Sequence, residues 1–159
     1  MMPAKKDLYI QNTDDFGHLE PLKIMGLTIY GEARGENRAG RIAVATVIME
    51  RVEHRKWDGE TIEDVCLWPE QFSCFLPNDP NRAKLALVAK DWDYHISIDR
   101  YLAACYQIAK GVENGTIPRD PDLHNANCCQ YLTTEAKKSA KWWKSMRMVK
   151  QIGNHEFYA

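Results

Sequence analysis

The feature that most constrains the fold of this 159-residue chain is a run between residues 42 and 52 that is apolar on nearly every face of a helix. Its apolar members are Ile42, Ala43, Val44, Ala45, Val47, Ile48, Met49 and Val52. A helix without a polar face has to be covered on all sides. The run therefore predicts a buried central helix that ends before Asp58–Gly59, and a chain of this length can supply the core around it.

One helix is predicted before this run and one after it. Pro21 suits a first helical turn, and apolar residues at helical spacing extend that helix to about Glu32. The segment Thr61–Asp64 resembles a capping sequence, with Asp in place of the usual Glu or Gln. It predicts a short helix through Leu67.

The next segment, residues 68–80, contains three prolines and many aromatic residues. It is predicted to be an irregular loop that covers a core or lines a cleft. A helix is expected over residues 82–90. A longer helix is predicted to start at Ser97 as its cap, to repeat apolar residues from Ile98 to Val112, and to stop at Asn114–Gly115.

The C-terminal part has weaker helical patterns. Residues 116–131 are predicted to be a loop, and residues 134–143 a short helix. Residues 148–152 and 155–158 predict two strands joined by a two-residue turn at Gly153–Asn154. The whole pattern indicates an α+β, mainly helical single domain with a small C-terminal β-hairpin.

Composition and charge exclude several classes of partner. Residues 1–19 are polar and predict a flexible N-terminal arm, which leaves residues 20–159 as one domain. The net charge of −1 gives no electrostatic argument for binding nucleic acid. Neither a secretory signal nor an apolar run near the ~18 residues of a membrane span is found. We therefore expect synthesis in the cytoplasm and no stable membrane insertion.

The cysteines and histidines do not form a metal-binding pattern. The five cysteines are an odd number without a regular framework, which predicts reduced thiols. The adjacent Cys128–Cys129 lacks the spacing of a zinc site, and the five histidines are scattered. We expect no metal and no cofactor.

Glu32 lies at the junction between an apolar helical run and a glycine-containing loop. A carboxylate there faces the negative end of the helix dipole and loses hydration if it is partly buried, and both effects favour the protonated form. Such a residue can act as a general acid. An exposed acid that merely fits a helix end is the more frequent case for this local pattern alone.

Four segments in this order resemble the SleB-type cell-wall hydrolase family, which includes spore-cortex-lytic enzymes and related phage lysins. They are Tyr30–Glu36 (Tyr-Gly-Glu-Ala-Arg-Gly-Glu), Gly40–Val52, Gln71–Ser73 and Ile152–Tyr158. The likeness covers roughly residues 22–158. The ordered set is far more specific than the Gly-Glu-Ala-Arg-Gly block alone.

The resemblance implies a lysozyme-like or lytic-transglycosylase-like fold and a catalytic domain over residues 20–159. It implies cleavage of the β-1,4 bond between N-acetylmuramic acid and N-acetylglucosamine in peptidoglycan, with Glu32 as the acid/base. Family members commonly carry a Gly-Ala-x-His-Tyr motif, whereas this chain has Gln130 before Tyr131. Only Tyr131 transfers from that motif.

Several other side chains are candidates for substrate binding or support. Gln71 and Ser73 could hydrogen-bond a sugar or orient Glu32, or could cap their own loop. Phe72 is expected to pack inward or to stack on the ligand. Tyr131 could line the glycan groove or pack in the core. His155 is expected to be a hydrogen-bonded structural residue, with support of the site as the alternative.

A second carboxylate is what distinguishes the two glycan-cleaving mechanisms. Glu36 is the nearest candidate in the sequence, and an exposed loop acid is the alternative interpretation. A lytic transglycosylase needs no second acid, because the 6-hydroxyl of the substrate closes onto the sugar. With one convincing acid, Glu32, this route is favoured over a water-using muramidase.

Two further alternatives come from other classes. One is a zinc amidase that cuts the peptide stem, and the other is a non-catalytic glycan-binding virion domain. The absence of a secretion signal leads us to expect a phage endolysin that meets peptidoglycan after a holin releases it from the cytoplasm.

Overall fold

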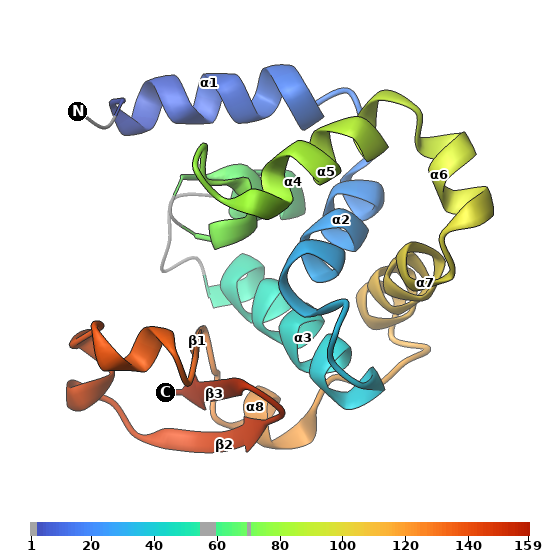
Figure 1. Cartoon of the computed structure of the whole chain (residues 1–159). Coiled ribbons are helices and arrows are strands. Elements are labelled where there is room, and N and C mark those ends of the chain that lie inside the picture. Colours follow the sequence, from blue (N-terminus) through green and yellow to red (C-terminus); the bar gives the residue numbers. More distant parts are fainter. Residues whose placement is uncertain (1–2, 55–59, 70) are drawn as a thin grey trace.

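The computed structural model describes residues 3–54, 60–69 and 71–159, which form a group of helices and a smaller sheet-containing part (Figure 1). In chain order the elements are α1 (Lys5–Phe16), α2 (Pro21–Ala33), α3 (Arg38–His54), α4 (Ile62–Leu67), the 3-10 turn η1 (Ser73–Phe75), α5 (Pro80–Lys90), α6 (Trp92–Ile98), α7 (Arg100–Asn114), α8 (Pro121–Asn125), β1 (Gln130–Thr133), the 3-10 turns η2 (Ala136–Lys138) and η3 (Trp142–Ser145), β2 (Met148–Ile152) and β3 (His155–Tyr158).

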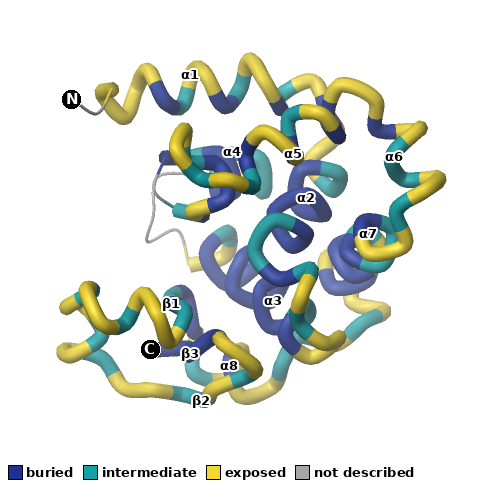
Figure 2. Tube along the Cα trace, viewed as in Figure 1, coloured by how far each residue is buried: buried dark blue, intermediate teal, exposed yellow. Residues whose placement is uncertain are grey.

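Helix α3 is the predicted central helix, and most of its length is buried (Figure 2). Its buried residues belong to two different clusters. Val44 and Ile48 belong to the core formed with the other helices. Ala43 and Val47 belong to a second cluster, completed by Leu123, Cys128 and Phe157. The helix is apolar all round because it supplies one wall to each core. Its expected end before Asp58–Gly59 lies outside the described residues.

The helices on either side of α3 have the predicted starts. Pro21 is at the first position of α2, where its missing N–H costs nothing. The Thr61 hydroxyl oxygen accepts a hydrogen bond of 3.1 Å from the backbone N–H of Asp64 at the start of α4. Between α4 and α5, the described residues of the proline-containing segment form the short turn η1 and no longer helix, as predicted.

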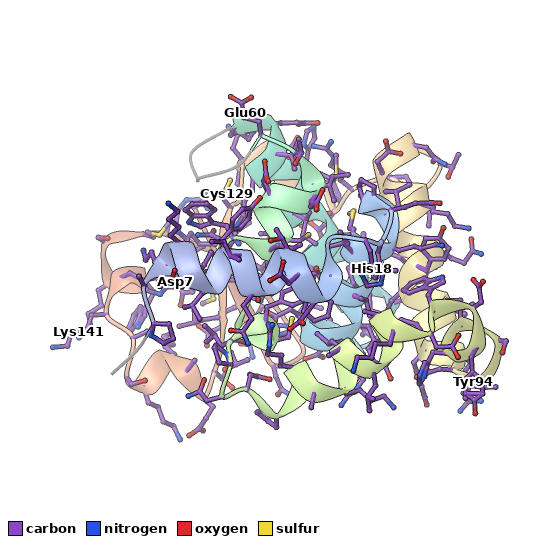
Figure 3. All side chains as sticks on the ribbon, turned by 90° about the horizontal axis from the view of Figure 1, so that it is seen from above. Asp7, His18, Glu60, Tyr94, Cys129 and Lys141 are labelled. Carbon is purple, nitrogen blue, oxygen red and sulfur yellow. The ribbon has the colours of Figure 1, made fainter. Side chains whose placement is uncertain are left out.

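The prediction of a flexible arm over residues 1–19 is wrong for residues 5–16, which form α1 and lie across the molecule when it is seen from above (Figure 3). The ring of Phe16 is fully buried, with its centroid 5.0 Å from that of Phe75. The buried Asn12 amide donates to the carbonyl of Leu67 at 2.8 Å. The mostly polar sequence did not predict this helix, because the helix is stabilised by a few contacts with residues far away in the sequence.

The predicted cap of the long helix was also misplaced. Ser97 lies inside α6, and Asp99 caps α7 by accepting from the backbone N–H groups of Tyr101 and Leu102 at 3.0 and 3.2 Å. Helix α7 ends at Gly115, which has the left-handed φ of +84°, as predicted.

The C-terminal sheet has one strand more than predicted. Strands β2 and β3 form the expected hairpin, and β1 pairs with the other side of β3, so that the antiparallel order is β1-β3-β2. Residues 116–131 were predicted to be a loop, but they contain α8 and the start of β1. The mainly helical α+β class is confirmed.

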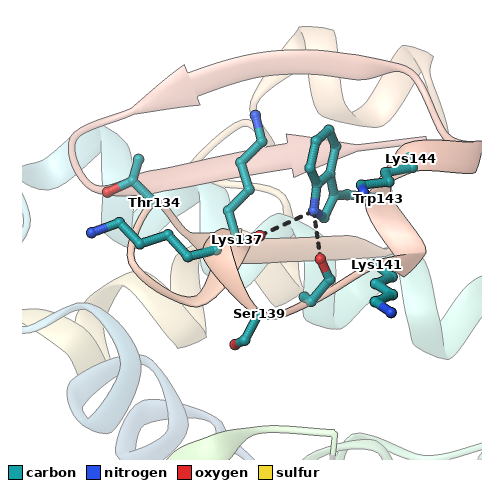
Figure 4. A pocket seen from close by; sticks show the side chains of 8 residues that line it. Thr134, Lys137, Ser139, Lys141, Trp143 and Lys144 are labelled. Atoms are coloured by element: carbon teal, nitrogen blue, oxygen red, sulfur yellow. Dashed lines mark hydrogen bonds between the residues drawn. The ribbon is translucent and has the colours of Figure 1, made fainter.

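Residues 134–143 do not form the predicted helix but contain η2 and the start of η3. The indole N–H of Trp143 donates to the carbonyls of Lys137 and Ala140 (Figure 4), which a continuous helix would use for its own backbone bonds. The rings of Trp142 and Trp143 both contact Tyr158, with centroids 5.8 and 6.2 Å from its ring.

Cys66, Cys74, Cys105 and Cys128 are buried free thiols, as predicted, and Cys129 is buried as well. Within the described ranges, no helix has both the length and the apolar character needed to cross a membrane.

Replacement of Gly153 by Ala should destabilise the fold. Gly153 has φ +57°, and a Cβ there would lie 2.1 Å from Oε2 of Glu36. The backbone strain alone costs about 1–3 kcal/mol of unfolding free energy, and the clash adds to it. Urea denaturation measures the loss. Gly115→Ala is the matched control because Gly115 has φ +84° with nothing within 4 Å of a Cβ. Equal losses in the two variants would contradict the contribution of Glu36.

Candidate active site

A cavity of about 380 Å³ lies where the helices meet the sheet. It is lined by the end of α2, the segment around η1, the start of α5, β1 and the segment after it, and β3. The lining residues are Gly31, Glu32, Gln71, Ser73, Asn81, Tyr131, Leu132, Thr133, Ala136 and His155. Five of the side chains that were singled out from the sequence therefore meet here, whereas Phe72 and Glu36 are not in the lining.

Both oxygens of the Glu32 carboxylate are held by donors from distant segments. Oε2 accepts from the Ser73 hydroxyl and from the backbone N–H of Cys74, each at 3.2 Å. Oε1 accepts from the Tyr131 hydroxyl. Glu32 lies near the C-terminal end of α2, as predicted, and these three bonds fix the orientation of its carboxylate.

Gly31 allows the turn η1 to come close enough to α2 for these bonds to form. A Cβ at residue 31 would lie 2.7 Å from Cβ and 2.8 Å from Sγ of Cys74. Any side chain there would move Cys74 away from Glu32. The glycine that precedes the acid in the sequence is thus part of the geometry of the site, a role that the sequence alone did not indicate.

Tyr131 is a neutral donor to Glu32. Burial of its hydroxyl raises its pKa well above the ordinary value, and the negative charge of Glu32 raises the pKa further. The Tyr131 ring packs edge-on against His155, with centroids 5.0 Å apart, and lies 5.4 Å from the ring of Phe157. Tyr131 therefore both lines the cavity and packs on the sheet.

Arg51 lies beneath the cavity, and the sequence analysis missed it. Its Nε donates to the carbonyl of Cys129 at 2.8 Å, and its Nη1 donates to the carbonyl of Gln71 at 3.1 Å. Burial lowers the pKa of Arg51, while negative charge near it, including that of Glu32, opposes the shift. The ring of Phe72, 1% exposed, packs 4.7 Å from this guanidinium, so Phe72 packs inward. The sequence signal that could have identified Arg51 is its position as a lone arginine in the most buried helical run, because a buried charge needs partners.

His155 lies between the cavity and Glu36. Its side chain is 4% exposed, and Nδ1 lies 3.8 Å from Oε1 of Glu36. Nδ1 has no hydrogen-bond partner among the described residues. Burial lowers the pKa of His155, and the charges of Glu36 and Glu32 oppose this shift.

Glu36 does not lie in the cavity of Glu32. Its Oε1 accepts from the backbone N–H of Asn154 at 3.3 Å, and its Oε2 occupies the space where a side chain at Gly153 would be. Glu36 therefore holds the β2–β3 turn. Among the described residues that line the cavity of Glu32, Glu32 is the only carboxylate.

The acidic cluster Glu50, Glu53 and His54 could bring ligand atoms within 4.8 Å of one another, but Arg119 already fills it. Oε2 of the fully buried Glu50 is 2.6 Å from Nη1 of Arg119 and 2.8 Å from Nδ1 of His124. The cluster acts as an ionic connection between α3 and the segment before α8.

The cavity in Figure 4 lies on the sheet-containing part and has a different character. It has a volume of about 340 Å³ and is lined by Thr134, Lys137, Lys138, Ser139, Ala140, Lys141, Trp143 and Lys144. It contains no acid, so it lacks the group that glycoside cleavage needs.

The buried His155 predicts a pH dependence of stability. Because burial lowers its folded-state pKa, the unfolded chain takes up the proton first as the pH falls. Stability is then lost below the ordinary histidine pKa of about 6.5. Urea denaturation between about pH 7.5 and about pH 5 should show a steeper loss for the wild type than for His155→Gln. His95→Gln, on helix α6, is the control and should keep the wild-type steepness; parallel curves for wild type and His155→Gln would refute the assignment.

Known proteins are similar to this chain in sequence and in fold. A family model described as Cell Wall Hydrolase matches residues 35–158, which begin just after Glu32 and include the other cavity residues from Gln71 to His155. The curated spore cortex-lytic enzyme of Oceanobacillus iheyensis is 32% identical over 79 residues. This match covers 45% of this chain and 28% of that enzyme, so the chain spans under a third of the relative's length.

Two solved structures share the fold. The catalytic domain of the Bacillus cereus SleB protein has a TM-score of 0.57 and 24% identity, covering 87% of this chain and 89% of that one. The catalytic domain of the germination-specific lytic transglycosylase SleB from Bacillus anthracis has a TM-score of 0.59 and 23% identity, covering 87% and 93%. The family match over most of the chain shows that this protein belongs to the cell wall hydrolase family, and the SleB-type resemblance of its motifs is confirmed.

Proposed function

We propose that this chain cleaves the glycan strand of peptidoglycan at the β-1,4 bond between N-acetylmuramic acid and N-acetylglucosamine, with Glu32 as the acid/base. The observation that carries the proposal is the Glu32 carboxylate, which three donors hold at the wall of a cavity in a member of the cell wall hydrolase family. The name of the curated relative, a spore cortex-lytic enzyme, indicates a substrate of the same class.

The hydrogen bonds around Glu32 suggest which oxygen carries the catalytic proton. The backbone N–H of Cys74 can only donate, so Oε2 has to remain an acceptor. The hydroxyl of Tyr131 can donate or accept, so Oε1 tolerates both protonation states. Oε1 is therefore the oxygen that we assign to proton transfer.

We further propose the lytic transglycosylase route. Glu32 protonates the glycosidic oxygen as the bond from that oxygen to C1 breaks. The resulting carboxylate then takes the proton from the 6-hydroxyl of the same muramic acid residue, and that oxygen bonds to C1. Support comes from Glu36, which holds the β2–β3 turn and leaves Glu32 as the only carboxylate among the described lining residues. A hydrolase that uses a nucleophile or an activated water normally places a second carboxylate across the bond.

Glu32→Gln should abolish the loss of turbidity of purified peptidoglycan, with a fall in rate of roughly 10²–10⁴-fold, because the amide cannot transfer the proton. Circular dichroism and thermal unfolding check that the variant is folded. Glu36→Gln is the matched control, and it should lose stability at the turn while it keeps most of the activity. Cleavage by Glu32→Gln at the wild-type rate would refute the assignment. A wild type without activity would favour a non-catalytic glycan-binding domain.

The products distinguish the two routes of cleavage. Mass spectrometry of fragments released from purified peptidoglycan should find 1,6-anhydromuramic acid ends, because the transglycosylase route adds no water. Reducing muramic acid ends would instead support a water-using muramidase.

The route by which the chain reaches the wall remains a prediction from the sequence. We propose a phage endolysin that is made in the host cytoplasm and released with the help of a holin. Support comes from the buried thiols of Cys66, Cys74, Cys105 and Cys128, which fit synthesis in a reducing compartment.

A further inference from the structure

A second cavity, of about 610 Å³, adjoins the cavity of Glu32, and Asn81 lines both of them. Three cationic side chains, those of Arg34, Arg41 and Lys84, line this second cavity. Its one carboxylate, Glu36, is engaged by the β2–β3 turn. The second cavity therefore has an excess of positive charge directly beside the candidate catalytic acid.

The three cations have no ion-pair partner in the part of the chain that the structure describes, and a further negative charge, that of Asp99, interacts electrostatically with Lys84. No carboxylate of the described residues forms an ion pair with Arg34, Arg41 or Lys84. Elsewhere the basic side chains near the sheet do have such partners, for example Lys150 with Asp120 at 2.9 Å. Unpaired guanidinium groups in a cavity favour a bound anion.

Both arginines are anchored, and each keeps an unused donor. Nη2 of Arg34 donates to Oδ1 of Asn81 at 3.2 Å, and Nη2 of Arg41 donates to the carbonyl of Arg34 at 2.9 Å. Nη1 of Arg34 and Nε of Arg41 are buried without a hydrogen-bond partner among the described residues. Because both side chains line the cavity and are held in place by these bonds, an anion in the cavity would meet guanidinium groups in fixed positions.

Aromatic rings support the two guanidinium groups. The guanidinium carbon of Arg34 lies 5.1 Å from the ring centre of Tyr30, and that of Arg41 lies 5.7 Å from the ring centre of Tyr101. The Tyr30 hydroxyl donates to Asp99 at 2.5 Å, which fixes the first ring. Arginine on an aromatic face with free N–H groups is the arrangement that suits a planar carboxylate.

We propose that Arg34, Arg41 and Lys84 form a carboxylate pocket that binds a carboxylate carried by the glycan strand beside the bond to be cleaved. This inference rests on the proposed function. Two sources offer the same chemistry: the free carboxylates of the peptide stem, and the lactyl carboxylate of a muramic acid residue that has lost its stem. Binding of either would place a charged branch next to Glu32 and so set the position of the strand.

Binding to the Glu32→Gln variant tests the pocket without cleavage. Three soluble strand fragments serve as probes: one with peptide stems, the same fragment with its carboxylates converted to carboxamides, and one stripped of its stems by an amidase. Calorimetry should show that at least one of the two carboxylate-bearing fragments, with stems or stripped of them, binds at least about tenfold more tightly than the carboxamide fragment. The tighter of the other two fragments identifies the source as stem or lactyl carboxylate.

Charge removal in the pocket should abolish this discrimination. In the Glu32→Gln background, Lys84→Gln and Arg41→Gln should bind the carboxylate and carboxamide fragments equally. Lys144→Gln is the matched control, because it removes the same charge from the cavity of Figure 4. The control site is remote from the carboxylate pocket. Lys141 lines the same cavity as Lys144, and Tyr94 lines a cavity that shares Lys84 with the carboxylate pocket. Figure 3 shows Tyr94 and Lys141 at opposite ends of the molecule.

The outcomes separate the two proposals. If Glu32→Gln still cleaves peptidoglycan, the proposed function fails whatever the fragments do. If cleavage is lost but the fragments bind equally well, or Lys84→Gln and Arg41→Gln both keep the discrimination, the carboxylate pocket alone is refuted. A loss of discrimination in Lys144→Gln as well would reduce the effect to overall charge and would also overturn the pocket.

Discussion

The buried guanidinium of Arg51 is the interaction on which the geometry of the cavity depends. It donates to the carbonyl of Gln71, which lines the cavity, and to that of Cys129, two residues before the lining residue Tyr131. Because Gln71 precedes Ser73 and Cys129 precedes Tyr131, one side chain of α3 positions the backbone that carries both hydroxyl donors to the carboxylate. A buried charge needs hydrogen-bond partners, so replacement of Arg51 would disturb the segments of Gln71 and Cys129 together.

The same helix joins the two parts of the molecule. One face of α3 packs into the helical core, and the other, with Ala43 and Val47, packs against Phe157 of the sheet. If the sheet were absent, that second face would expose apolar surface, so the helices and the sheet stabilise each other. A cavity at such a junction receives side chains from both parts, which is why Glu32 meets Tyr131 there although the two are far apart in sequence.

Local signals in the sequence predicted the elements that local interactions form. The apolar run of α3 and the turn before β3 are examples, because their patterns are complete within a few residues. The cap of α7 was misplaced because Ser97 and Asp99 are both good caps, and Ile98, which the apolar pattern assigned to the long helix, is exposed at the end of α6. Strand β1 had no signal of its own, since its position comes from pairing Tyr131 with Phe157. In the site, sequence motifs identified Glu32 as a candidate. The contacts of Arg51 and the close approach at Gly31 are tertiary, so no local sequence pattern predicted them.

Glu32 and Glu36 are chemically identical and close in sequence, yet the fold gives them different environments. Helix α2 ends at Ala33, so Glu36 leaves the helix and reaches the β2–β3 turn, where it accepts from Asn154 and excludes a side chain from residue 153. Glu32 stays on the helix and faces hydroxyl donors that can reverse their hydrogen bonds. Because Glu32 is the only carboxylate among the described residues that line its cavity, the proposed mechanism assigns both proton transfers to it.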